Sequence, residues 1–193
     1  MPSKLVTSSV IPVEVMAPVA ARTRKAPKVP KDFVGKVSAQ VWQEIQPLKT
    51  DFKEPKRWPK YLLLDTPTLD YLIRDAYRLS QTAVVAINEP GITCYVSECS
   101  WLELAEKMKR DLYEINVSFG EFMNQVMTHY KLQLLPMDAL ALEKYRNLSA
   151  LPNAASRITC GWLVAQSLAI GATLISPDGH FEAYRSQGLK QLW

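Results

Sequence analysis

This chain of 193 residues has few residues that could form a zinc site or a disulfide framework. Its three cysteines and two histidines are Cys94, Cys99, Cys160, His129 and His180. Neither histidine lies near a pair of cysteines in the sequence, so we expect no structural zinc site. An odd cysteine count without paired spacing is typical of a reducing compartment. We therefore expect a cytoplasmic protein.

Long hydrophobic runs are also absent. No stretch reaches the ~20 continuous apolar residues that a membrane helix needs. The longest candidate, Gly161 to Ile175, is interrupted by Gln166, Ser167 and Gly171, and we interpret it as a buried helix, a turn and a strand. Hydrophobic residues make up 48% of the chain, which is typical of a globular protein with one substantial core. We expect no contact with a membrane.

The first sixty residues differ from the rest in proline content and in charge. They contain eight of the 13 prolines, and twelve Lys and Arg against five acids give them a charge of +7. The whole chain carries +4, so the remainder carries −3. Because proline removes a backbone donor, we predict a flexible basic extension over residues 1–59, in which Ser38 to Ile45 could form a short helix. The charge favours contact with a polyanion such as RNA, and a solubilising tail is the alternative.

Residues from 60 onward alternate between short apolar runs and amphipathic segments. The apolar runs predict strands at residues 61–64, 93–96, 132–135 and 173–175, with an edge strand at 189–192. The other segments predict helices at residues 68–74, 81–87, 100–110, 118–129, 138–148 and 160–169, and a short helix from Phe181. Such alternation is typical of a parallel sheet covered by helices on both faces. We therefore predict one α/β domain over residues 60–193.

Acidic residues follow three of the expected strands. Asp65 comes directly after the first apolar run, Glu103 lies on the helix after the second, and Asp178 follows the fourth. Because parallel strands bring their carboxyl ends to one edge of a sheet, we expect these side chains to lie at that edge. Carboxylate oxygens are the ligands that hard divalent cations prefer, so the pattern predicts a site for Mg²⁺ or Mn²⁺.

Six motifs, in this order, resemble those of the PIN domain, in particular the VapC class of toxin–antitoxin ribonucleases. Tyr61 to Thr66 (YLLLDT) is similar to the family sequence LLDTH, and Val96 to Ala105 is similar to VSAASLWEIA. The other four matches are residues 134–137, 148–152, 162–169 and 173–178. Any single motif of this kind is weak, whereas six at compatible spacing form a specific signal. The resemblance covers residues 61–193.

The resemblance implies a three-layer α/β/α PIN fold and a nuclease that hydrolyses RNA phosphodiester bonds. In PIN nucleases the acids bind one or two divalent ions, which activate a water and stabilise negative charge during an in-line attack on phosphorus. Carried over residue by residue, Asp65, Glu103 and Asp178 are the catalytic and metal-binding residues, with Mg²⁺ or Mn²⁺ as the cofactor. The resemblance also implies RNA as a partner, an antitoxin-like or other protein partner, and a homodimer.

One acidic position of the family is missing here. The family helix usually begins DPFDR before LLVAQ, and the corresponding run is Arg157 to Gly161 (RITCG), which places Cys160 at the third acid and Arg157 at its flanking acid. A thiol is a softer ligand than a carboxylate and does not suit Mg²⁺. Three hypotheses therefore stay open. One is a metal-dependent ribonuclease of PIN type with impaired activity. The second is a catalytically degenerate PIN module that binds RNA or a protein partner without cleavage. The third is a structural subunit docked through its extension.

Several polar residues near the three acids have more than one interpretation. Glu106 lies one turn after Glu103 and could partly replace the missing acid, although a solvated surface position is favoured. Asp70 is expected to point to solvent. Thr66 and Ser97 could hydrogen-bond the carboxylates, and helix capping is the alternative for Ser97.

Overall fold

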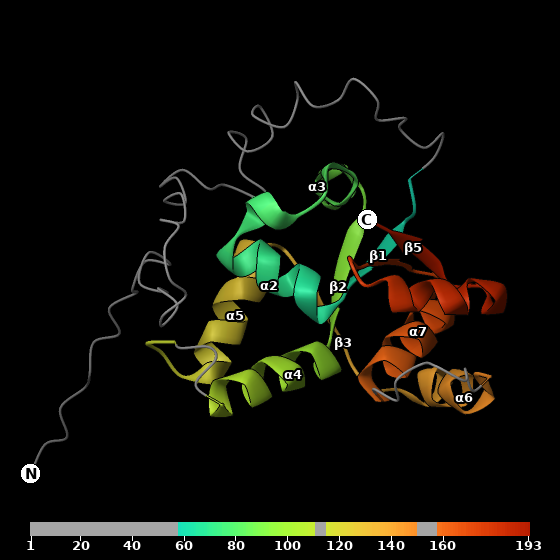
Figure 1. Cartoon of the computed structure of the whole chain (residues 1–193). Helices are drawn as coiled ribbons and strands as arrows, with labels where there is room; N and C mark the ends of the chain where they lie inside the picture. Colours follow the sequence, from blue (N-terminus) through green and yellow to red (C-terminus); the bar gives the residue numbers. More distant parts are fainter. Residues whose placement is uncertain (1–57, 111–114, 150–157) are drawn as a thin grey trace, which may run out of the picture.

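The computed structural model describes residues 58–110, 115–149 and 158–193 (Figure 1). The predicted extension up to residue 57, with its short helix at Ser38 to Ile45, lies outside the described residues, and so does Arg157. None of the helices in the three described ranges combines the length and the apolar character needed to cross a bilayer.

Five parallel strands form one sheet in the order β3-β2-β1-β4-β5. They are β1 (Tyr61–Leu64), β2 (Thr93–Ser97), β3 (Gln133–Leu135), β4 (Thr173–Ile175) and β5 (Lys190–Leu192). The structure confirms all five predicted strands, and the last one lies at the edge as expected. Because every strand is parallel, all the carboxyl ends lie at one edge of the sheet. Asp65 and Ser176 leave the sheet there, directly after the adjacent strands β1 and β4.

In the described residues, six helices connect and cover the strands, each within two residues of its predicted bounds. They are α2 (Thr66–Arg74), α3 (Gln81–Asn88), α4 (Glu98–Lys109), α5 (Phe119–His129), α6 (Ala139–Asn147) and α7 (Ile158–Ile170). Two 3₁₀ segments, η3 (Ala76–Arg78) and η4 (Gly179–Gln187), complete the described part. Helix α2 begins two residues earlier than predicted, because Asp65 caps it and Pro67 suits its first turn.

The helices cover both faces of the sheet and form a three-layer α/β/α arrangement (Figure 1). Successive residues of a strand point to opposite faces, and the central strand β1 shows this directly. Leu62 and Leu64 pack with residues of α2, α3, α4 and α5 in one apolar cluster, whereas Leu63 packs with residues of α7 and η4 in a second. All three leucines are fully buried. The predicted α/β fold with helices on both faces is therefore confirmed.

Candidate metal centre

Asp65 ends β1 and caps α2 with a buried carboxylate. Its Oδ1 accepts the backbone N–H of Thr68 at 2.7 Å, and its Oδ2 accepts the hydroxyl of Ser176. The residue is only 2% exposed. Burial raises the pKa of Asp65 from 3.8 to about 6, although the hydrogen bonds from Ser176 and Thr68 lower it and the charge of Asp178 raises it further. A cation bound at this carboxylate would offset the cost of burying its charge.

Ser176 connects Asp65 to the second acid. Its Oγ donates to Asp65 and accepts the backbone N–H of Asp178 at 3.0 Å. Asp178 caps η4, because its Oδ1 accepts the backbone N–H of His180 at 2.9 Å. The same Oδ1 lies 2.6 Å from Nδ1 of His180, whose side chain is exposed. The structure thus brings Asp65 and Asp178 to neighbouring positions at the carboxyl edge of the sheet.

Glu103 lies on α4, which follows β2, the other neighbour of β1. The residue is half-buried. Burial, together with the charges of Glu103 and Glu98, raises the pKa of the Cys99 thiol. Within residues 58–110, 115–149 and 158–193, no group of three or more His, Cys, Asp or Glu side chains is arranged to hold a metal ion. Glu103 therefore does not join Asp65 and Asp178 in one ligand cluster.

Asp70 is buried, so the expectation that it points to solvent is wrong. It is 5% exposed, and its carboxylate accepts from Nε of Arg74 at 2.6 Å. Nζ of Lys107 lies 3.8 Å from the same carboxylate, which connects α2 to α4. A buried carboxylate needs such partners to offset its loss of hydration. Position along α2 could not predict this burial, because it depends on how α4 packs against that helix.

Three other residues near the acids have simpler roles. Glu106 is paired with Lys109 at 2.6 Å at the surface, which agrees with the solvated position favoured from sequence. The Ser97 hydroxyl accepts the N–H of Cys99 at 3.1 Å and caps α4, so the capping interpretation is right. The Thr66 hydroxyl is buried and makes no hydrogen bond within the part of the chain that the structure describes.

Cys160, which stands at the missing acid, lies in the first turn of α7. It is half-buried and packs against the apolar cluster that contains Leu63, Leu163 and Tyr184. Burial, and to a smaller extent the charge of Cys160, raises the pKa of Tyr184. In this position Cys160 behaves as a small apolar residue.

Two residues at the site had no role assigned from the sequence. Ser176 lies inside a matched motif, and its place two residues before Asp178 is a local turn signal that could have been used. Gln191 on β5 has no such signal. Its side-chain amide donates to the carbonyls of Ser176 and Asp178 at 3.0 and 2.9 Å, and so holds the turn that carries the second acid.

The donor set at this edge suits a hard divalent cation with few protein ligands. Mg²⁺ is commonly held by one or two carboxylates and keeps several waters, which leaves room for substrate phosphates. Asp65 and Asp178 supply two such carboxylates, and the buried hydroxyl of Thr66 next to Asp65 is a further oxygen that lacks a partner among the described residues. Asp65 and Asp178 therefore fit this type of centre.

Removal of the Ser176 hydroxyl tests the connection between the two acids. We expect Ser176→Ala to raise the pKa of Asp65 above its value of about 6, because the wild-type hydrogen bond from Ser176 stabilises the ionised carboxylate and the variant lacks it. Carboxyl carbon NMR titration of Asp65 measures this shift. Ser186→Ala is a matched control, since the Ser186 hydroxyl is exposed and donates to Ala183 within η4. An unchanged titration of Asp65 in Ser176→Ala would contradict the arrangement.

No family profile and no curated protein sequence matches this chain. Among solved structures it is similar to VapBC2 from Rickettsia felis bound to a DNA fragment from their promoter, with a TM-score of 0.48 and 15% identity over 68% of this chain and 97% of that one. It is also similar to VapBC-1 from nontypeable Haemophilus influenzae, with a TM-score of 0.44 and 16% identity over 68% of this chain and 96% of that one. For FitAcB from Neisseria gonorrhoeae the TM-score is 0.43 and the identity is 17%, over 68% of this chain and 96% of that one.

Proposed function

We propose that this protein is a divalent-ion-dependent endoribonuclease of PIN type. The observation that carries the proposal is the pair of carboxylates at the ends of the adjacent strands β1 and β4, joined through one hydroxyl. Glu103, on the helix that follows the other neighbour of β1, is the third acid in the proposal. This placement agrees with the order of acids in the family that the sequence resembles.

The chain's own residues would position the reacting groups in the following way. Asp65 and Asp178 would hold Mg²⁺ or Mn²⁺, and Glu103 would orient a bound water. When bound, the ion supplies an activated water and offsets negative charge on the phosphate. Thr68 and Ser176 fix the two oxygens of Asp65, so the carboxylate keeps one orientation. Gln191 fixes the turn that presents Asp178.

Ion binding and RNA cleavage with three substitutions test this proposal. We expect Asp65→Asn and Asp178→Asn to abolish Mn²⁺ binding in calorimetry, because each removes a carboxylate that would hold the ion. All three variants should lose Mn²⁺-dependent cleavage of RNA, because Glu103→Gln removes the charge that would orient the bound water.

Glu106→Gln is the matched control for Glu103→Gln. It lies one turn later on α4, is paired with Lys109 at the surface, and should keep both activities. Full cleavage by Asp65→Asn would refute the proposal.

A second function, RNA or protein binding without cleavage, is favoured by two specific observations. The described residues contain no cluster of three ligands, and Cys160 packs with apolar residues where the family has an acid. The resemblance also implies an antitoxin-like partner and a homodimer, and exposed apolar side chains on α4, α6 and α7 suit a protein contact. They are Leu102, Leu140, Leu142 and Ile158. RNA binding that persists in all three variants without any cleavage by the wild type would support this second function.

A further inference from the structure

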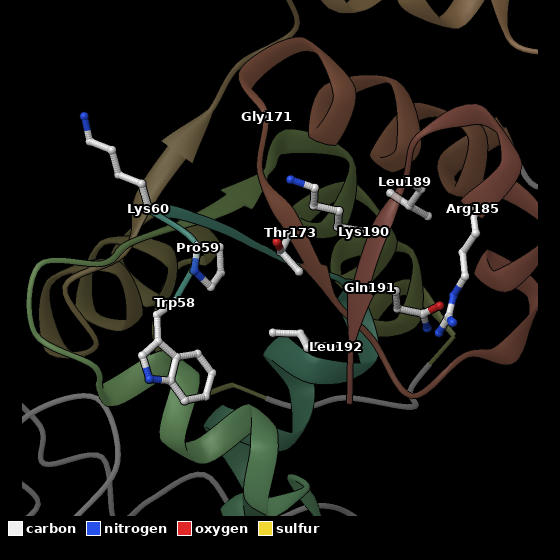
Figure 2. Close-up of a pocket in the computed structure, with 10 residues that line it drawn as sticks. All are labelled: Trp58, Pro59, Lys60, Gly171, Thr173, Arg185, Leu189, Lys190, Gln191 and Leu192. Carbon is white, nitrogen blue, oxygen red and sulfur yellow. The ribbon is translucent and has the colours of Figure 1, made fainter. Parts of the chain in front are cut away.

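A groove of about 740 Å³ lies along the edge strand β5 (Figure 2). Its walls come from the residues that precede β1, from the beginning of β4, from the whole of β5, and from η4. Asp65, Glu103 and Asp178 are not among the residues that line it. The groove therefore lies beside the candidate metal centre and shares only Gln191 with the described residues of that centre.

The charge of the groove is positive. Lys60, Arg185 and Lys190 line it, all three are exposed, and no acidic residue is among its described lining residues. Arg185 lies 3.5 Å from Glu182, but both side chains are exposed, and such a pair binds too weakly to withdraw the cation from a ligand. Three cations that line one groove provide counter-charge for the phosphates of a polyanion.

An aromatic ring lines the same groove. Trp58 lines the groove, and its half-buried indole packs against the apolar cluster of α2 to α5, which holds it in place. Figure 2 shows Trp58 at one end of the groove and Arg185 at the other. A groove lined by an aromatic ring and by cations is the combination with which proteins bind single-stranded nucleic acids, because bases stack on the ring while cations follow the backbone. An acidic peptide would use the cations alone.

We propose that this groove binds a segment of single-stranded RNA outside the candidate metal centre. The inference rests on the proposed function in taking RNA as the substrate. Lys60 precedes Asp65 by five residues along an extended strand, so roughly 17 Å separates these two residues. One oligonucleotide can span this distance. Strand β5 connects them, since Lys190 lines the groove and Gln191 holds the turn of Asp178.

RNA binding without cleavage tests the cations of the groove. The full chain is titrated in EDTA against a short fluorescent oligouridine, over a range of salt concentrations. The triple variant Lys60→Ala, Arg185→Ala, Lys190→Ala should bind more weakly and lower the slope of log affinity against log salt by about 2, since each phosphate contact on a single strand contributes about 0.7. The control variant Lys109→Ala, Lys144→Ala, Arg146→Ala removes the same charge from exposed positions outside the groove.

Substitution of Trp58 tests the stacking. Trp58→Leu should weaken binding roughly five- to a hundredfold, the range expected for the loss of one stacked base, whereas Trp58→Phe should retain most of the affinity. Thermal melts show whether Trp58→Leu still folds, because this ring also packs on the core. If it does not fold, the triple charge variant and Trp58→Phe decide the question.

Two results would overturn the inference. One is an equal affinity and salt slope for the groove and control triple variants. The other is displacement of the RNA by an acidic peptide with no effect of Trp58→Leu, which would assign the groove to a protein. Failure of the nuclease proposal is a separate result. A wild type that never cleaves RNA, but binds it through the groove, leaves the inference intact. If the wild type cleaves RNA and the two triple variants bind RNA with equal affinity, the nuclease proposal stands and the groove proposal fails.

Discussion

Replacement of Asp65 by asparagine should increase the stability of the folded protein at neutral pH by about 3 kcal/mol. Burial raises the pKa of Asp65 from 3.8 to about 6. The folded state therefore binds this proton more tightly than the unfolded state does. Stability falls as the pH rises between these two values and stays low above them. Asparagine cannot ionise, and its side-chain oxygen can still accept the N–H of Thr68, so the variant avoids this loss.

Urea denaturation at two pH values measures this effect. The gain of Asp65→Asn should be full at about pH 7.5 and absent at about pH 4, where the wild-type carboxyl group is mostly protonated in the folded state. Asp138→Asn is a matched control, because Asp138 caps α6 with the same 2.7 Å hydrogen bond to a backbone N–H but is exposed. It should show no comparable gain. Equal stability of Asp65→Asn and the wild type at neutral pH would show that burial of this charge is not costly.

The same substitution separates folding from function. Asp65→Asn is expected to be more stable and yet to lose ion binding and cleavage, so its inactivity could not be attributed to unfolding. Such an opposition between stability and activity is common where a site stores an unfavourable buried charge. If the proposed centre binds a divalent ion, that ion should restore part of the lost stability of the wild type, because it would bind the ionised carboxylate of the folded state.

Replacement of Phe122 by alanine should destabilise the fold by about 3–5 kcal/mol, the usual loss for a buried aromatic side chain. Phe122 on α5 is 1% exposed and makes an edge-to-face contact with Trp101, with ring centroids 6.0 Å apart. Trp101 lies on α4, two residues before Glu103. The lost stability therefore includes the aromatic contact between α5 and α4, the helix that carries Glu103.

Chemical denaturation of Phe122→Ala and Phe119→Ala measures this contribution. Phe119 belongs to the same aromatic group, with its ring centroid 6.2 Å from that of Trp101, but it is only half-buried. Because its removal leaves a space open to solvent, Phe119→Ala should lose much less stability. Equal losses in the two variants would contradict the central place of Phe122 in this cluster.

The sequence by itself determined the elements of the fold and their order. Apolar runs such as Tyr61–Leu64 and Thr173–Ile175 became strands, and Ser97 and Asp138 became helix caps. These features depend on interactions within a few residues, namely side-chain periodicity and hydrogen bonds to the first turn of a helix. The placement of Asp65 at a strand end follows from the same local pattern.

Only the tertiary structure decided what surrounds these residues. Ser176 meets Asp65 across 111 positions of sequence, and Asp70 is buried because α4 and its Lys107 pack beside α2. Gln191 reaches the turn of Asp178 only because β5 pairs with β4. The groove is lined by Trp58 and Lys60 together with β5, which lies far from them in the sequence. Contacts of this kind depend on how whole elements pack, and local periodicity carries no signal for them. The pKa of Asp65 has the same origin, because its largest cause is burial by elements distant in sequence.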